Sequence, residues 1–213
     1  MPLVLKPRKS DAHTPIGQAM FGIERLLAHY PHLKKKRIRI LEPSAGRGNI
    51  IEAIRNTNKL KRNKIVAVEL RNQYRNRLDT LADTVYCPQD FLEWAKSEHG
   101  KFHLIIGNPP YGKNIEGKFV KTALSLLKPN GVLFFLLKLS FAEGVNRFEE
   151  IFKKIQPHGM SILSRRIKFY ANGGGDRYSY CWFAFCKNAT TPQWLEIVNN
   201  LPIQKPLRLN VGR

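Results

Sequence analysis

Apolar residues along the chain alternate between two spacings, which predict strands and helices in turn. Segments at 38–41, 64–70, 83–87, 102–107 and 131–139 are short and rich in apolar residues, as buried strands are. The intervening segments carry apolar residues at helical spacing, most clearly residues 14–29 with Ile16, Met20, Ile23 and Leu27. Such strand–helix alternation predicts an α/β fold, in which a mostly parallel sheet has helices on both faces.

The last third of the chain has a different pattern. Two further strands are expected at about residues 161–169 and 178–185, forming a C-terminal antiparallel hairpin around the loop ANGGGDR. We expect a single domain over residues 1–190, with the helix at 14–29 included. Residues 191–213 contain Pro192, Pro202 and Pro206 and are expected to form a loosely ordered tail.

Two glycines follow the first predicted strand, in the stretch LEPSAGRGNI. Gly46 and Gly48 would allow a sharp turn and the close approach of a ligand, in front of a helix N-terminus. Glu69 ends the next strand, 23 residues after Gly46, where a carboxylate can accept hydrogen bonds from ribose hydroxyls. An ordinary loop and a solvated strand-end carboxylate are the alternatives for these residues.

The cofactor that suits this loop is S-adenosylmethionine. The third glycine of a dinucleotide fingerprint is missing, since Ile51 stands in its place, which disfavours a pyrophosphate. Glu42 precedes the turn, where it would repel a phosphate but attract an ammonium or sulfonium group. S-adenosylmethionine has both groups.

The fourth strand ends in the corner Asn108, Pro109, Pro110 and Tyr111. The adenine amine is a poor nucleophile because its lone pair is delocalised into the ring. The side-chain oxygen of Asn108 and the carbonyl of Pro109 can accept hydrogen bonds from such an amine, and two prolines hold these acceptors still. Tyr111 offers a face on which a flipped base can stack. The alternative is a rigid turn with a core tyrosine.

Taken together, these motifs resemble those of S-adenosylmethionine-dependent N6-adenine methyltransferases of class I, Rossmann-like fold. The resemblance covers residues 13–187 and follows the gamma-type order, in which Thr14–Pro15 precedes the glycine motif. Its C-terminal part, with Arg166, Phe169 and Tyr180, is similar to compact phage and prophage DNA adenine methyltransferases. The matching motifs are EPSAGRG at 42–48, Glu69, QDF at 89–91 and NPPY at 108–111.

The resemblance implies further cofactor contacts. Asp90 would bond the adenine amino group of the cofactor, and Phe91 would pack against its ring, although core filling is an alternative for Phe91. Glu42, Ser44 and Gly46 would line the methionine portion, with Thr14 nearby. Larger members of the family have a separate target-recognition domain, for which this chain has no room, so a short target site or weak sequence preference is expected.

The charge of the chain points to a polyanionic partner. Lys and Arg number 36 against 16 Asp and Glu, a net charge of +20, and the resemblance and Tyr111 favour DNA over RNA. The predicted function is methyl transfer to adenine N6 in DNA. Structured RNA, a protein glutamine or a nucleic-acid-binding module without turnover are the alternatives. The basic clusters that could contact phosphates lie at 34–37, 59–64, 71–77 and 165–168.

Other residue types restrict the class of protein. Cys87, Cys181 and Cys186 are scattered, and neither they nor the six histidines have a metal-ligand spacing, so no metal is expected. The longest apolar run, residues 132–137, is too short to span a membrane, and no signal peptide is evident. We expect a cytoplasmic protein of a bacterial or phage-infected cell; the sequence does not indicate an oligomeric state.

Overall fold

The computed structural model describes residues 13–35, 37–97, 99–112, 114–169, 177–188 and 192–200. Their strands form one eight-stranded sheet in the order β3-β2-β1-β4-β5-β7-β6-β8. The parallel part consists of β1 (Arg39–Glu42), β2 (Lys64–Val68), β3 (Thr84–Tyr86), β4 (Phe102–Gly107) and β5 (Leu127–Lys138). We call the end at which these strands finish the carboxyl edge, and the opposite end the amino edge.

The remaining strands are β6 (Gly159–Leu163), β7 (Tyr180–Cys186) and β8 (Trp194–Val198). Strand β7 is antiparallel to both β5 and β6, whereas β8 pairs with β6 in parallel. The predicted α/β fold with a mostly parallel sheet and a C-terminal antiparallel hairpin is therefore confirmed.

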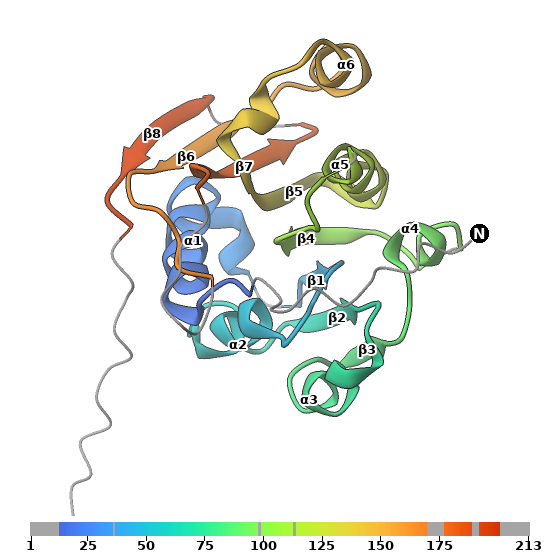
Figure 1. Ribbon diagram of the computed structural model, residues 1–213. Coiled ribbons are helices and arrows are strands. Elements are labelled where there is room, and N and C mark those ends of the chain that lie inside the picture. The colour runs from blue at the N-terminus through green and yellow to red at the C-terminus, as the bar shows by residue number, and fades with distance from the viewer. Residues whose placement is uncertain are drawn as a thin grey trace, which may run out of the picture.

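Helices cover both faces of the sheet (Figure 1). One face carries α1 (Ile16–His29), α2 (Asn49–Asn56) and α3 (Arg75–Asp79), and the other carries α4 (Phe91–Trp94), α5 (Ile115–Ser125) and α6 (Val145–Arg147). A π-helical turn (Phe148–Phe152) follows α6, and 3-10 turns lie at Pro31–Lys34, Asn72–Tyr74 and Leu139–Ala142. Each face buries its own apolar cluster.

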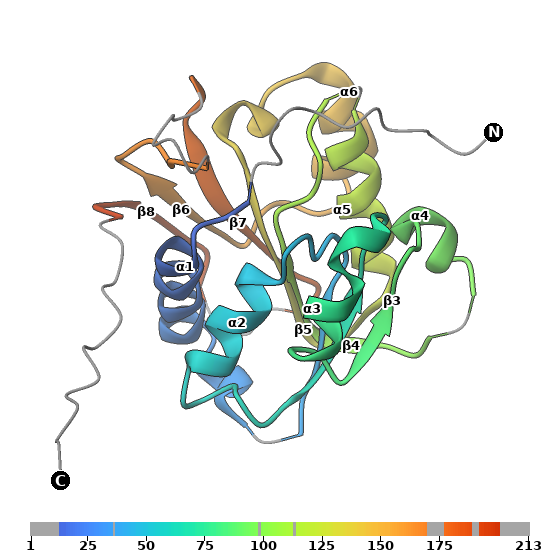
Figure 2. The ribbon, with the colours of Figure 1, turned by 60° about the horizontal axis from the view of Figure 1, so that its bottom comes forward.

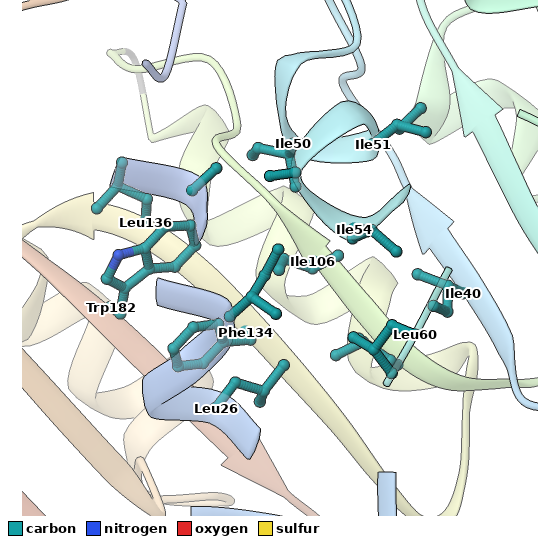
Figure 3. Close-up of a cluster of buried hydrophobic side chains, with 14 of the residues drawn as sticks. Leu26, Ile40, Ile50, Ile51, Ile54, Leu60, Ile106, Phe134, Leu136 and Trp182 are labelled. Carbon is teal, nitrogen blue, oxygen red and sulfur yellow. The ribbon is translucent and has the colours of Figure 1, made fainter. Parts of the chain in front are cut away.

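The cluster under α1 and α2 shows why these segments fold as they do. Figure 3 shows part of it, with Leu26, Ile54 and Trp182 gathered around the strand residues Ile106 and Phe134. The Trp182 indole lies parallel to the Phe134 ring, at a centroid distance of 4.8 Å. The apolar stripe of each helix thus packs on a strand that is buried on both faces, as the periodicity predicted.

Several boundaries differ from the sequence-based expectations. Residues 71–82, one of the segments between predicted strands that were expected to be helical, form a 3-10 turn followed by the five-residue α3. Strand β6 ends at Leu163 instead of continuing to Phe169. Of the predicted loop ANGGGDR, only Arg177 lies within the described residues.

Strand β8 was not predicted, because its residues fall in the region expected to be a tail. Contacts with α1, far away in the sequence, hold it in place. The Trp194 ring stacks on His29 at 3.8 Å, and Arg25 pairs with Glu196. The opposite face of β8 presents Leu195 and Ile197, which are exposed. The apolar residues of β8 are therefore divided between two faces, and local sequence gives no inward-facing pattern.

Among the described residues, no helix has the length and apolar character needed to cross a membrane. Nor does the described part of the chain contain a group of three or more His, Cys, Asp or Glu side chains that could hold a metal ion. Cys87, Cys181 and Cys186 are all buried, and none forms a disulfide.

Candidate functional site

The glycine loop after β1 has the backbone conformation that only glycine adopts readily. Gly46 and Gly48 have φ of 51° and 77°, in the left-handed region. A Cβ on Gly48 would also lie 2.8 Å from the Leu81 side chain. Gly48 is the N-cap of α2, so the loop places the N-terminus of this helix at the carboxyl edge of the sheet.

Glu69 lies directly behind this loop, immediately after β2. Its two carboxylate oxygens accept hydrogen bonds from the backbone N–H groups of Gly46, at 2.6 Å, and Arg71, at 2.9 Å. The residue is only 7% exposed. A carboxylate held from both sides in this way has a fixed position. The fold thus places Glu69 beside the glycine loop, and its predicted contact with ribose hydroxyls stays a prediction.

Glu42 and Thr14 provide the polar atoms that fit a charged ligand. Both residues are buried, and Glu42 Oε2 and Thr14 Oγ1 have no hydrogen-bond partner among the described residues. Burial, together with the nearby charge of Glu69, raises the pKa of Glu42 well above its usual value. A cationic ligand would supply the missing partner for the carboxylate. The residues therefore fit the amino-acid and sulfonium end of S-adenosylmethionine.

Asp90 and Phe91 have clear roles within the protein. Asp90 Oδ1 caps α4 by accepting hydrogen bonds from the backbone of Leu92, at 2.7 Å, and Glu93, at 3.2 Å. The Phe91 ring is buried and contacts Phe119 at a centroid distance of 4.9 Å. Their contacts with the cofactor adenine stay predictions, and for Phe91 the structure shows the core packing that was the alternative.

The Asn-Pro-Pro-Tyr corner follows β4 directly and lies against the glycine loop. The Ser44 hydroxyl donates a hydrogen bond of 3.1 Å to the Asn108 carbonyl, which joins the two loops across the edge of the sheet. Pro109 is buried, and no hydrogen bond to its carbonyl is found within the described part of the chain. The structure thus brings together the two groups of residues that the sequence analysis assigned to cofactor and base.

The Tyr111 hydroxyl lies between two oxygens. It contacts Asn108 Oδ1 and is 2.9 Å from the Leu136 carbonyl of β5. A hydroxyl has one proton and cannot donate to both, whereas the oxygen and nitrogen of an amide are interchangeable by a flip. Both contacts are satisfied if the hydroxyl donates to Leu136 and the Asn108 amide nitrogen donates to the hydroxyl.

An aromatic cluster surrounds Tyr111. The Tyr180 ring lies 5.7 Å from Tyr111, and Phe169 lies 5.0 Å from Tyr180. The ammonium group of Lys138 lies 3.5 Å over the Tyr178 ring and 5.4 Å over the Tyr111 ring. Sequence analysis singled out Phe169 and Tyr180 but missed Lys138 and Tyr178. The available signal was a lone lysine near the end of an otherwise apolar strand.

A groove opens beside this corner. It is lined by the loop that follows Tyr111, with Gly112 and Asn114, and by the residues around the start of α6, with Val145 and Arg147. The Val145 side chain is 78% exposed. The groove therefore adjoins the chain immediately after Tyr111.

Two solved structures with a similar fold are named as methyltransferases. The chain matches a protein of Listeria monocytogenes, described as a class I S-adenosylmethionine-dependent methyltransferase, with a TM-score of 0.67 and 14% identity, over 92% of this chain and 68% of that one. It matches a type I restriction-modification methyltransferase subunit of Streptococcus thermophilus with a TM-score of 0.68 and 15% identity, over 94% and 52% of the two chains. The chain thus spans only about half the length of the latter. No curated protein matches the sequence significantly.

These likenesses show the class, a class I methyltransferase fold, and confirm that prediction. The family model of the Eco57I restriction-modification methylase matches residues 27–158, more than half of the chain. The chain therefore belongs to the Eco57I restriction-modification methylase family, and S-adenosylmethionine is its cofactor.

Proposed function

We propose that this protein transfers a methyl group from S-adenosylmethionine to the N6 amino group of adenine in DNA. The observation that carries the proposal is the hydrogen bond from Ser44 to the Asn108 carbonyl. It holds a rigid corner rich in acceptors directly beside the cofactor loop, so that an amine at the corner and a methyl group at the loop would be neighbours. Such positioning is the largest contribution available to a transfer between two bound molecules.

The donor half of the site consists of residues that hold the cofactor. S-adenosylmethionine supplies a methyl group bonded to a cationic sulfur. Glu69, fixed by the backbone of Gly46, would accept hydrogen bonds from the ribose hydroxyls, and the unsatisfied oxygens of Glu42 and Thr14 support a role in binding the methionine end. Asp90 and Phe91 would contact the adenine. The unsatisfied oxygens of Glu42 and Thr14 gain their partners only when such a ligand is bound.

The acceptor half consists of two oxygens. With its amide nitrogen toward the Tyr111 hydroxyl, Asn108 has its side-chain oxygen available for one N–H of the target amine. The Pro109 carbonyl is available for the other N–H. Two accepted hydrogen bonds favour a more tetrahedral nitrogen, whose lone pair is then free to attack. Pro109 and Pro110 keep the acceptors in place, so little reorganisation is needed when the base binds.

Tyr111 has two roles in this proposal. Its ring, with Tyr180 and Phe169 behind it, provides the surface on which the flipped base stacks. Its hydroxyl, bonded to the Leu136 carbonyl, sets the orientation of the Asn108 amide. Tyr111 is therefore both a stacking and a positioning residue.

Two observations support DNA as the substrate: the net positive charge of the chain, and its similarity to restriction-modification proteins. The net charge of +20 favours a polyanion. The Eco57I family takes its name from a restriction-modification methylase, and the fold resembles a chain in a structure of a DrdV–DNA complex, with a TM-score of 0.57, 17% identity and coverage of 89% of this chain and 28% of that one.

The experiment is a methyl-transfer assay with labelled S-adenosylmethionine and three acceptors: duplex DNA, structured RNA and a mixture of proteins. We expect label in DNA and N6-methyladenine after enzymatic digestion of the product. Label in RNA or in protein glutamine would replace the DNA proposal with that substrate. Cofactor binding without label in any acceptor would leave a binding module that has no turnover.

A further inference from the structure

The amino edge of the sheet, opposite the site, carries a dense group of exposed cations. They belong to two loops, one leading into β1 and the other leading into β2. We call this group the amino-edge cluster. Its members are Lys34, Lys35, Arg37, Lys59, Lys61, Arg62 and Lys64, all of which are exposed.

The two loops lie side by side. The backbone N–H of Ile38 donates a hydrogen bond of 3.1 Å to the side-chain oxygen of Asn63, and Arg39 is in register with Lys64 in the parallel pair of β1 and β2. Figure 2 shows both loops at the lower end of the sheet, whereas the segment between β4 and α5 leaves from the upper end. Cations that are separate in the sequence thus form one continuous surface.

No carboxylate neutralises this surface among the described residues. The stretches 31–39 and 56–64 contain no Asp or Glu, and no member of the cluster takes part in an ion pair within the described part of the chain. Asp83 reaches the start of β2 through a 2.7 Å hydrogen bond from the Ile65 backbone, but it is already paired with Arg55, also at 2.7 Å. The cations repel one another, and among the described residues the fold gives them no carboxylate partner; Lys61 donates a hydrogen bond of 3.0 Å only to the neutral side chain of Asn58.

The cluster is too far from the site to serve it. The cations precede the strands, whereas Glu69 and Asn108 follow them, and a five-residue strand such as β2 spans about 16 Å. Phosphates that flank a base bound at Asn108 would meet the carboxyl edge. The sequence analysis grouped the four basic stretches together; the structure places 34–37 and 59–64 at the edge opposite the site.

We propose that the amino-edge cluster is a second binding surface for double-stranded DNA, which holds a segment other than the one that carries the target base. Seven exposed cations suit the closely spaced phosphates of a duplex, and contacts to phosphates do not distinguish bases. No member is buried, so the surface does not form a pocket for a small anion. Such an anchor keeps the protein on DNA independently of sequence. This proposal does not depend on the proposed methyl transfer.

The test uses the full chain and a fluorescent duplex made only of G·C pairs, which offers the site no adenine. One variant replaces Lys35, Lys59, Lys61 and Lys64 with Gln. The matched control removes the same charge elsewhere, by replacing Lys96, Lys118, Lys121 and Lys153 with Gln; three of these lysines pair with glutamates. Fluorescence anisotropy measures Kd between about 50 and 200 mM salt, a range over which several phosphate contacts change the affinity steeply.

We expect the slope of log Kd against log salt to fall by about 3 to 4 in the amino-edge variant and by less than about 1 in the control. Melting temperatures of both variants report whether they are folded. Equal slopes for the two variants would show that net charge alone binds DNA, and would overturn the proposal. So would a slope unchanged from the parent.

Two further arms separate DNA from other polyanions. A duplex RNA of the same length and vesicles containing phosphatidylserine are titrated under the same conditions. The proposal requires that the amino-edge substitutions weaken DNA binding more than they weaken binding to either of these. A larger loss for RNA or for vesicles would assign the surface to that partner instead.

Discussion

The two edges of the parallel sheet are built from opposite kinds of residue. The carboxyl edge holds buried or half-buried groups, such as Glu42, Glu69, Asn108 and Tyr111, each fixed by the fold. The amino edge holds the exposed lysines and arginines of the amino-edge cluster, none of which takes part in an ion pair within the described part of the chain. The same strands form both edges. The site residues follow these strands and the amino-edge cluster precedes them, so the strand direction places the two groups at opposite ends of the sheet.

The difference shows which kind of substitution each edge tolerates. At the carboxyl edge, the proposed methyl transfer depends on the position of single atoms, so one substitution should have a large effect. At the amino edge, the proposed DNA binding depends on the number of charges, so any one residue should matter little and their sum should matter much. The following predictions run from the largest expected effect to the smallest.

Asn108→Ala removes one of the two acceptors for the target amine. We expect methyl transfer to fall by roughly a hundredfold to a thousandfold, as when one preorganised hydrogen-bonding group is deleted from an active site. Single-turnover rates measure the effect, and calorimetry should show cofactor affinity within a few-fold of the parent. Asn58→Ala, at an exposed asparagine near the amino edge, is the control. A comparable loss of cofactor binding in Asn108→Ala would place Asn108 in the donor half.

Glu42→Gln removes the buried charge that the cationic end of the cofactor would neutralise. We expect Kd for S-adenosylmethionine to rise roughly tenfold to a hundredfold, the range for hydrogen bonds to charged groups. Calorimetric titration measures it, with Glu93→Gln, an exposed glutamate, as the control. An unchanged Kd would mean that Glu42 does not contact the cofactor.

The same variant has a predictable effect of pH on stability. Because burial and Glu69 raise the pKa of Glu42, the folded protein binds a proton that the unfolded chain has already released. The free energy of unfolding therefore falls as pH rises from the ordinary carboxyl pKa toward the raised one. Glu42→Gln lacks this proton, so without cofactor it should melt above the parent at neutral and alkaline pH. The difference in melting temperature between the variant and the parent should shrink toward acid pH. A difference that does not change with pH would contradict this prediction.

Tyr111→Phe keeps the ring but removes the hydroxyl that orients Asn108. We expect kcat to fall roughly threefold to tenfold with little change in KM, in line with one neutral hydrogen bond. Tyr111→Ala also removes the stacking surface and should raise KM for DNA roughly tenfold or more. If the two variants lose the same activity in the same parameter, the hydroxyl has no role separate from the ring.

Lys64→Gln has the smallest predicted effect, which contrasts with the large loss of methyl transfer expected for Asn108→Ala. It should lower the salt slope of duplex binding by about 0.9 and leave kcat at saturating DNA unchanged. Anisotropy titrations at several salt concentrations measure the slope. A fall in kcat would show that the two edges do not act separately.

The sequence predicted the carboxyl edge well because its signals are local. Gly46 and Gly48 have the left-handed backbone that favours glycine, and the stretch 102–107 forms β4 at the predicted bounds. The turn and the strand could therefore be predicted from the residue types in each short stretch. Glu69 was placed by spacing alone. The roles assigned to these residues toward cofactor and base stay predictions.

What the sequence did not yield depends on contacts between distant segments. Strand β8 pairs with β6 and packs on α1, where Trp194 contacts His29 and Glu196 pairs with Arg25, and no local pattern reveals these contacts. Lys138 was missed because its aromatic contact, the ring of Tyr178, is forty residues away in the sequence. The amino-edge cluster was visible as two basic stretches ahead of strands, but their shared surface required the register of β1 and β2.

The Ser44–Asn108 hydrogen bond has a consequence for the order of events in the site. Since one hydroxyl joins the cofactor loop to the base corner, we expect a ligand that orders either loop to favour the same arrangement of the other. Under the proposed function, thermodynamic reciprocity requires that any gain in base affinity caused by the cofactor equals the gain in cofactor affinity caused by the base. The protein would then bind DNA more tightly when S-adenosylmethionine is bound. Breaking the Ser44–Asn108 hydrogen bond would weaken the binding of both ligands together.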